Sequence, residues 1–219
     1  MKINAAKCKV IGESVGQITI DNNAVENVEK FVFLGSVVPN SSDDVKRRIA
    51  LASSAFGKLK KKIWGNRDLS YHIKLRLYSS LIVPIAIYAS ETWTLKAEDT
   101  RRLLVFENDC LRTMVGKTRR DRCKLVDIRK NLGIKCNIVD VIQKRRLNWF
   151  GHVVRRGGDS NVYRSYQESF PGKRPIGRPP KRWSDQIRKE TGIPLKTLER
   201  TATDRDRWKK FVNKKCAKI

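Results

Sequence analysis

The chain has 219 residues, 40% of them hydrophobic, which allows one ordinary domain or two small ones around a modest core. Its formal net charge is +26, and residues 41–219 carry all of it, because residues 1–40 hold as many acids as bases. A surplus of this size needs a counter-charge, so contact with a nucleic-acid backbone is expected. No apolar run reaches membrane-spanning length, since the segment from Leu81 to Ala89 is too short, and no membrane partner is expected.

The five cysteines are odd in number and scattered. No two lie within four residues of each other, so the ligand spacing of a zinc finger is absent. Cys123, Cys136 and His152 are separated by long gaps and lack a nearby fourth ligand, which argues against a metal site. Reduced thiols in an intracellular protein are the simpler interpretation.

The first 38 residues have the pattern of β-strands. The stretch from Val15 to Ile20 alternates apolar and polar residues. Phe31 to Leu34 is an apolar, aromatic run that ends at Gly35, which is a turn signal. We expect a small β segment here.

After Pro39 the apolar period becomes that of a helix. Ser41 or Ser42 can cap it, and Asp43-Asp44 in its first turn suits the positive end of the helix dipole. One stripe is apolar, with Val45, Ile49, Ala52, Phe56, Leu59 and Ile63. The opposite face is basic, with Lys46, Arg47, Lys58, Lys60, Lys61 and Lys62. Gly65 and Asn66 end this helix.

Further helices follow in the pattern of apolar residues. We expect them from Ser70, over Ala97–Val115, Asp121–Leu132 and Ile138–Arg155, and as two short helices around Trp183 and Trp208. The helix from Ser70 should bury Ile73, Leu77, Leu81, Pro84 and Tyr88 and kink at the proline. The helix from Ile138 should bury Ile142, Trp149 and Val153. The expected fold class is mainly α with a small N-terminal β segment (α+β), a helical bundle followed by a loosely structured basic tail.

No residue set forms a self-sufficient active site. Asp43 and Asp44 lie at a helix start, where the helix dipole explains them, and not on the strand or hairpin that presents metal-binding aspartates in polymerases. His72 and His152 have no Ser or Asp arrangement typical of a triad, and no Gly-rich phosphate loop occurs. We therefore assign no catalytic residue, no metal ligand and no cofactor to this chain.

Basic residues precede a tryptophan at three places. Trp64 follows Lys58–Lys62, Trp149 follows Arg145-Arg146, and Trp183 follows Lys181-Arg182. Each tryptophan could stack on an unpaired base beside its cations, or each could be an apolar anchor within its helix. The pattern alone leaves both interpretations open, with the anchor favoured for Trp149.

The stretch GKRPIGRPPKRW, residues 172–183, should be an extended basic ribbon. Its prolines disfavour a helix, and Lys173, Arg174, Arg178, Lys181 and Arg182 stand on it without an acid. The core IGRPPK resembles an AT-hook, although Ile176 stands where that motif has Arg. An arm that grips a nucleic-acid backbone is favoured over an inert linker.

Several long blocks together resemble the C-terminal part of the reverse transcriptase of LINE-type, non-LTR retrotransposons, in particular RTE-like elements. These blocks are MKINAAKCK, VEKFVFLGSVV, VKRRIALASSAFGKLKK, KLRLYSSLIVPIAIYASETWTL, RLLVFENDCLRTMVG, RRLNWFGHVVRR and GKRPIGRPPKRW. They cover nearly the whole chain in the order of the family. This resemblance identifies the class of protein more specifically than the net charge does.

The resemblance implies a division of the chain. Residues 1–40 would be the end of the palm, with Lys7 at the position of the family's palm lysine, although Cys8 stands where the family usually has Thr. Phe31, Phe33, Leu34 and Gly35 would form the hairpin that grips the primer terminus. Residues 41–116 would be the helical thumb, residues 117–170 a basic helical region, and residues 171–219 the Pro-rich arm with short helices.

The resemblance also implies the partner, an RNA–DNA hybrid or duplex DNA. The contacts would come from basic residues of the thumb, the following helix and the arm, namely Lys58, Lys60, Lys61, Lys62, Lys144, Arg145, Arg146, Arg174, Arg178, Lys181 and Arg182. The missing palm and fingers are a further expected partner.

The family's catalytic aspartates, which bind Mg²⁺ in the parent polymerase, lie upstream of the part that this chain matches. We therefore expect a fragment that binds template–primer without polymerising, in an intracellular and nuclear location. Three alternatives stay open: an incomplete gene model of an active polymerase, a pseudogene remnant with Phe31 and Phe33 exposed, and a domesticated basic DNA-binding protein.

Overall fold

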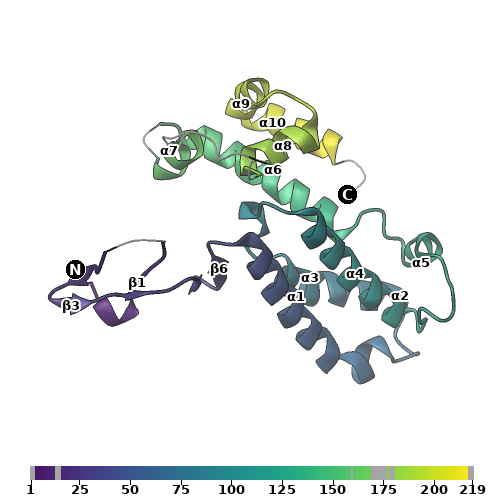
Figure 1. Ribbon diagram of the computed structural model, residues 1–219. Helices are drawn as coiled ribbons and strands as arrows, with labels where there is room; N and C mark the ends of the chain where they lie inside the picture. Colours follow the sequence, from purple (N-terminus) through teal and green to yellow (C-terminus); the bar gives the residue numbers. More distant parts are fainter. Residues whose placement is uncertain (1–2, 13–15, 159, 169–176, 178–180, 217–219) are drawn as a thin grey trace.

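The computed structural model describes residues 3–12, 16–158, 160–168, 177 and 181–216. Figure 1 shows an N-terminal arm that extends away from a bundle of helices, and a long helix, α6, that leads from this bundle to a second helical group. The fold is mainly helical with a few short strands, which confirms the expected fold class.

The N-terminal arm holds the β-structure. Its strands pair as three two-stranded sheets: β1 (Lys9–Val10) with β4 (Glu26–Asn27), β2 (Thr19–Ile20) with β3 (Asn23–Ala24), and β5 (Phe31–Phe33) with β6 (Ser36–Val38). The first pair is parallel and the other two are antiparallel. Val25 is the buried hydrophobic residue of the described part of this arm. An isolated two-stranded pair is marginally stable, so the arm has little core of its own.

Helix α1 (Ser41–Lys58) follows the predicted stripe, with Val45, Ala52 and Phe56 buried. Its N-cap, however, is Asn40, whose side chain accepts from the Ser42 amide at 3.0 Å, and not Ser41 or Ser42. A π-helical turn, Lys60–Trp64, continues the helix to Gly65. The predicted amphipathic helix is therefore confirmed, with one correction at its cap.

The helix predicted from Ser70 is broken into three pieces around Pro84. These are α2 (Tyr71–Leu77), a π-helical segment (Tyr78–Ile82) and α3 (Val83–Ala86). Proline has no amide hydrogen and clashes in a regular helix, which explains the predicted break. The predicted inner face was wrong, because Ile73, Leu81 and Tyr88 are exposed. The altered period in the π-helical segment turns a different set inward, namely Tyr78, Ile82 and Ala86.

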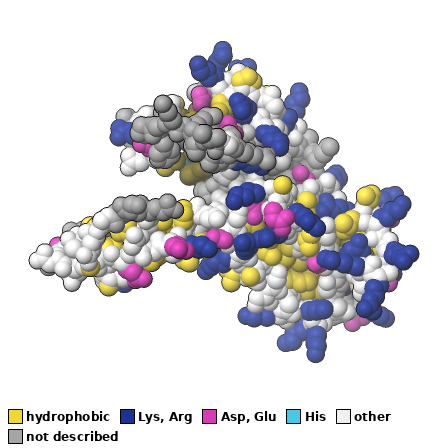
Figure 2. Space-filling model, in the orientation of Figure 1, with side chains coloured by type: hydrophobic (Ala, Val, Ile, Leu, Met, Phe, Trp, Pro, Cys, Tyr) yellow, Lys and Arg dark blue, Asp and Glu magenta, His cyan; other side chains and the backbone are white. Residues whose placement is uncertain are grey.

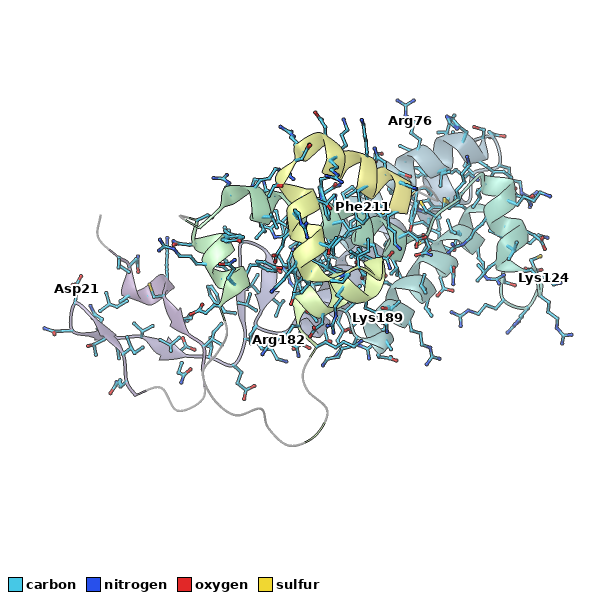
Figure 3. The ribbon with its side chains drawn as sticks, turned by 90° about the horizontal axis from the view of Figure 1, so that it is seen from above. Asp21, Arg76, Lys124, Arg182, Lys189 and Phe211 are labelled. Atoms are coloured by element: carbon cyan, nitrogen blue, oxygen red, sulfur yellow. The ribbon has the colours of Figure 1, made fainter. Side chains whose placement is uncertain are left out.

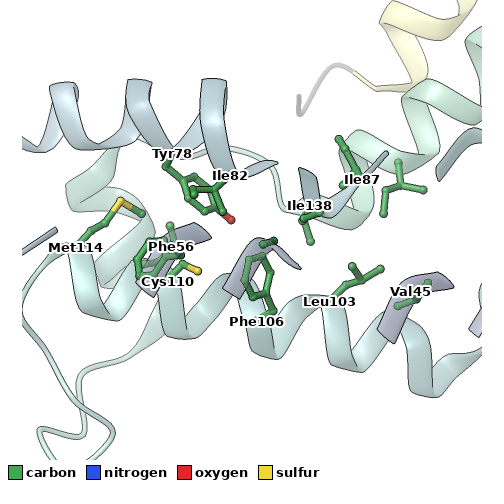
Figure 4. Close-up of a cluster of buried hydrophobic side chains, with 14 of the residues drawn as sticks. Val45, Phe56, Tyr78, Ile82, Ile87, Leu103, Phe106, Cys110, Met114 and Ile138 are labelled. Carbon is green, nitrogen blue, oxygen red and sulfur yellow. The ribbon is translucent and has the colours of Figure 1, made fainter. Parts of the chain in front are cut away.

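The first core forms around α1, which packs against both α3 and α4 (Ala97–Met114). Figure 4 shows its apolar side chains, which come from helices far apart in the sequence. Helix α5 (Leu125–Leu132) begins four residues later than predicted. Before it, the Asp121 carboxylate accepts from both the amide and the hydroxyl of Thr118, which forms a turn in place of a helical start.

Helix α6 (Ile138–Arg156) joins the two cores. Ile142 belongs to the first core, and Leu147, Phe150 and Val154 belong to the second. Trp149, which was predicted to face inward, is only half-buried.

The second core lies between α6 and the C-terminal helices. These are α7 (Asn161–Gln167), α8 (Trp183–Thr191), α9 (Leu195–Thr203) and α10 (Arg205–Lys215). The predicted short helices around Trp183 and Trp208 are confirmed, whereas α7 and α9 were not predicted. The prediction of a loosely structured tail was wrong for residues 183–216, because α8, α9 and α10 pack into this core. Among the described helices, none is both long and apolar enough to cross a membrane.

Candidate nucleic-acid interface

Basic side chains cover the helical part of the molecule. Figure 2 shows Lys and Arg side chains spread over the bundle and the second helical group, whereas few of them lie on the face of the arm that is in view. From above, the side chains of Arg76, Lys124, Arg182 and Lys189 point away from the ribbon (Figure 3). Several of the predicted contact residues lie within this wide basic surface.

The lysine cluster at the end of α1, defined as Lys58, Lys60, Lys61 and Lys62, is exposed. Within the described residues, none of its members forms an ion pair with an acid. Positive charge at a helix C-terminus is favoured by the helix dipole, so the cluster is compatible with the local fold. It is also available to an external anion.

Trp64 holds this cluster outward. Its indole lies flat on Phe56, with ring centroids 4.6 Å apart, and its Nε1 donates to the Phe56 carbonyl at 2.8 Å. The side chain is almost completely buried. Trp64 is thus an anchor that turns the preceding lysines toward solvent, and the alternative of a stacking platform is wrong for this residue.

The triplet Lys144–Arg146 divides between surface and interior. Arg145 is exposed and donates through Nη1 to the Ile87 carbonyl at 3.0 Å, and Lys144 is half-buried. Arg146 is fully buried, pairs with Glu190 and donates to the Trp93 carbonyl at 3.2 Å. Its prediction as a phosphate contact was wrong, because a buried guanidinium that is paired in this way cannot reach an external ligand.

The structure describes Lys181 and Arg182 at the end of the predicted arm. Arg174 and Arg178 lie outside the described residues, and Lys181 and Arg182 are exposed just before α8. Trp183 donates through Nε1 to the Glu91 carbonyl at 2.8 Å, and its ring lies 6.3 Å from that of Phe150. This tryptophan therefore fastens the end of the arm to the helical body.

The predicted primer-grip hairpin, β5–β6, is fixed at the start of α1. Leu34 and Gly35 form its two-residue turn, both with positive φ, as tight hairpins require. The Tyr88 hydroxyl donates to the Leu34 carbonyl at 3.0 Å, and Arg47 donates to the Gly35 carbonyl at 2.7 Å. Phe33 and Leu34 are 58% and 78% exposed, whereas Phe31 is half-buried. The hairpin thus presents an apolar tip on a fixed base.

Asp44 connects this hairpin to the helices. Its carboxylate accepts from the Ser36 hydroxyl at 2.7 Å, the Val37 amide at 2.9 Å and the Trp93 indole at 2.9 Å. The predicted dipole role is therefore incomplete for Asp44, which is fully buried. Asp43 beside it pairs with Lys30 at 2.9 Å, a hydrogen bond that lowers the pKa of the Asp43 carboxyl.

The other predicted residues lie apart from the lysine cluster. Lys7 is exposed at the end of a short 3-10 helix in the arm. The hairpin and the lysine cluster mark opposite ends of α1, about 25 Å apart at 1.5 Å per residue, which is roughly seven base pairs of duplex. Helix α8, which starts after Arg182, bonds to the segment before α4, since the Gln186 side chain accepts from the Leu95 amide at 2.9 Å. The predicted contacts are therefore distributed along the bundle and do not form one patch.

A groove of about 700 Å³ runs along the molecule between α1 and α4. Its floor is apolar, with Ile49, Phe56, Val105 and Phe106. Its rim carries both signs of charge, from Lys46, Lys60, Arg101, Arg102, Glu98 and Asp109. The sequence did not indicate this groove, because it exists only where two distant helices pack side by side.

Comparison with known proteins gives one informative similarity. The chain is 25% identical over 228 residues to the transposon-derived protein F52C9.6 of Caenorhabditis elegans, covering 95% of this chain and 81% of that protein. No family model matches the chain, and no solved structure matches it. The similarity extends over both cores and supports a transposon origin for this chain.

Proposed function

We propose that this chain binds the template–primer duplex of a transposon-encoded reverse transcriptase, as the thumb and basic C-terminal region of that polymerase, without catalysing polymerisation itself. The observation that carries the proposal is the lysine cluster, which is exposed, unpaired within the described residues and held outward by Trp64. Phosphates are the natural counter-ions for such a cluster on a chain of charge +26.

The spread of the basic residues over the bundle supports a duplex ligand. An elongated, regularly charged ligand can contact basic residues that lie far apart on a surface, whereas a small anion requires them to converge. Lys181 and Arg182 supply charge at another site, and Arg145 supplies it on α6. The proposal assigns no cofactor to this chain, since Mg²⁺ would bind the aspartates of the parent polymerase. It also implies a nuclear location.

The test is the salt dependence of binding, measured by titration with matched RNA–DNA, DNA–DNA and single-stranded ligands. The variant changes all four lysines of the cluster to Gln. We expect the slope of log K against log salt to become shallower by about 0.9 for each phosphate contact that is lost. A preference for the hybrid favours the reverse-transcriptase assignment, whereas a preference for duplex DNA favours a domesticated DNA-binding protein.

A control variant removes the same charge elsewhere. Lys189, Lys196, Lys209 and Lys210 are exposed on the C-terminal helices, and their change to Gln should alter the slope less. Equal effects of the two variants would show that total charge acts without a defined interface. An affinity that does not depend on salt would overturn the proposal.

A further inference from the structure

An aromatic pair lies on the exposed face of α6. The rings of Trp149 and His152 are stacked, with centroids 5.1 Å apart and planes 19° from parallel. Trp149 is half-buried and His152 is exposed. The stack therefore has one end supported by the helix and one end open to solvent.

The hydrogen bonds of the tryptophans set Trp149 apart. The indole nitrogens of Trp64, Trp93, Trp183 and Trp208 each donate to a protein oxygen. The indole nitrogen of Trp149 has no protein acceptor among the described residues. It is also not one of the buried polar atoms that lack a partner. The other four tryptophans are anchors, whereas the Trp149 indole keeps a donor that faces solvent.

Arginines flank this pair. Arg156 donates through Nε to Nε2 of His152 at 3.3 Å. The accepting lone pair lies in the plane of the imidazole, so this bond steadies the ring without covering its face. Arg145 is exposed one turn before Trp149, and the sequence from Val141 to Arg156 contains no acid. Arg155 is held away from the pair, since its guanidinium donates to the Ala202 carbonyl at 2.8 Å. A base that stacks here would have cations on both sides for its phosphates.

We propose that the Trp149–His152 pair is a stacking site for an unpaired base, so that α6 binds single-stranded nucleic acid. Aromatic faces accept any base, and neighbouring cations hold the backbone, which is the usual design of single-strand sites. The inference rests on the proposed function for its nucleic-acid partner and adds a second mode of binding, separate from the lysine cluster. The base would extend the stack on the open face of His152 and bring its phosphates to Arg145 and Arg156.

The experiment compares an oligothymidine strand with an abasic strand of the same length and charge. The intact chain should bind the strand with bases about tenfold more tightly, which is the effect of one base–aromatic stack. Trp149→Leu and His152→Ala should remove this difference and leave the salt slope for duplex unchanged. Trp149→Phe, the matched control, should keep most of it.

Fluorescence gives a readout that does not depend on affinity. Oligothymidine should quench the tryptophan emission of the intact chain, and Trp149→Phe should abolish the quenching although it still binds. His152→Ala is a second variant in case Trp149→Leu does not fold, since His152 is exposed. If the intact chain binds oligothymidine and the abasic strand equally well and still binds duplex, this inference is overturned and the proposed function is not. Loss of all salt-dependent binding would instead overturn the proposed function.

Discussion

Glu107 is a carboxylate that the fold has removed from water. It accepts from the Ile138 amide at 2.9 Å and from Arg129 at 2.6 Å, and it therefore joins α4 to α5 and to the start of α6. Burial raises its pKa to about 7, because desolvation of the charged form outweighs these two donors. Its charge is thus costly to the fold although its hydrogen bonds are well formed.

The stability of the protein should depend on pH through Glu107. Between pH of about 4.5 and about 7, the folded state keeps a proton that the unfolded state has released, so the free energy of unfolding falls as pH rises. The fall is on the order of 3 kcal/mol at 1.36 kcal/mol per pKa unit. Glu107→Gln should flatten this dependence in urea titrations. Glu98→Gln, an exposed change on the same helix, controls for the lost charge, and an equal effect of both would contradict the prediction.

At the scale of elements, two glycines show how one residue type serves different purposes. Gly57 lies on the exposed side of α1, and an added Cβ there would have open space. Gly151 lies in α6 against α10, where a Cβ would overlap the indole of Trp208. That indole is buried and donates to the Leu147 carbonyl at 3.0 Å, so it cannot easily move aside.

The two substitutions to alanine should therefore change the stability of the protein in opposite directions. Gly57→Ala should stabilise the protein by roughly 0.5–1 kcal/mol, because alanine loses less backbone entropy in a helix. Gly151→Ala should destabilise it by about 1–3 kcal/mol through overpacking between α6 and α10. Thermal unfolding of both variants measures the difference. A stabilising Gly151→Ala would show that α10 does not pack closely on α6.

At the scale of the whole molecule, one buried ion pair joins the two cores. Arg146 of α6 pairs with Glu190 of α8, and it also donates to the carbonyl of Trp93, a residue of the first core. The side chain of Arg146 is fully buried and that of Glu190 is 11% exposed. The pair fixes how the second helical group sits on the bundle.

Removing one partner of this ion pair should lower the free energy of unfolding more than replacing both partners with apolar side chains. Arg146→Met leaves the Glu190 charge buried without its partner and should destabilise the protein by about 3–5 kcal/mol. The double variant Arg146→Met, Glu190→Met should recover most of this loss, because two apolar side chains need no compensating charge. Urea unfolding compares the variants. A double variant as unstable as the single one would contradict this account.

The sequence by itself determined the local features of this protein. The period of apolar residues predicted α1, α4 and α6, the proline predicted the break at α3, and the charge balance separated a neutral arm from a basic body. These features depend on neighbours within one or two turns, so the order of residues contains them. The lysine cluster is of this kind, since Trp64, which holds it outward, packs on Phe56 only eight residues earlier in the chain.

Only the tertiary structure decided which charged and aromatic side chains remain at the surface. Arg146 is buried because it bonds to Glu190 and to the Trp93 carbonyl, which are both more than forty residues away in the sequence. Asp44 is buried because it accepts a hydrogen bond from the indole of Trp93. Trp64 and Trp149 each follow basic residues in the sequence, yet one is an anchor and the other lies half-exposed. The burial of Arg146 and Asp44 arises from packing between distant segments, because desolvation and hydrogen bonding depend on every neighbour in space and not on the local pattern.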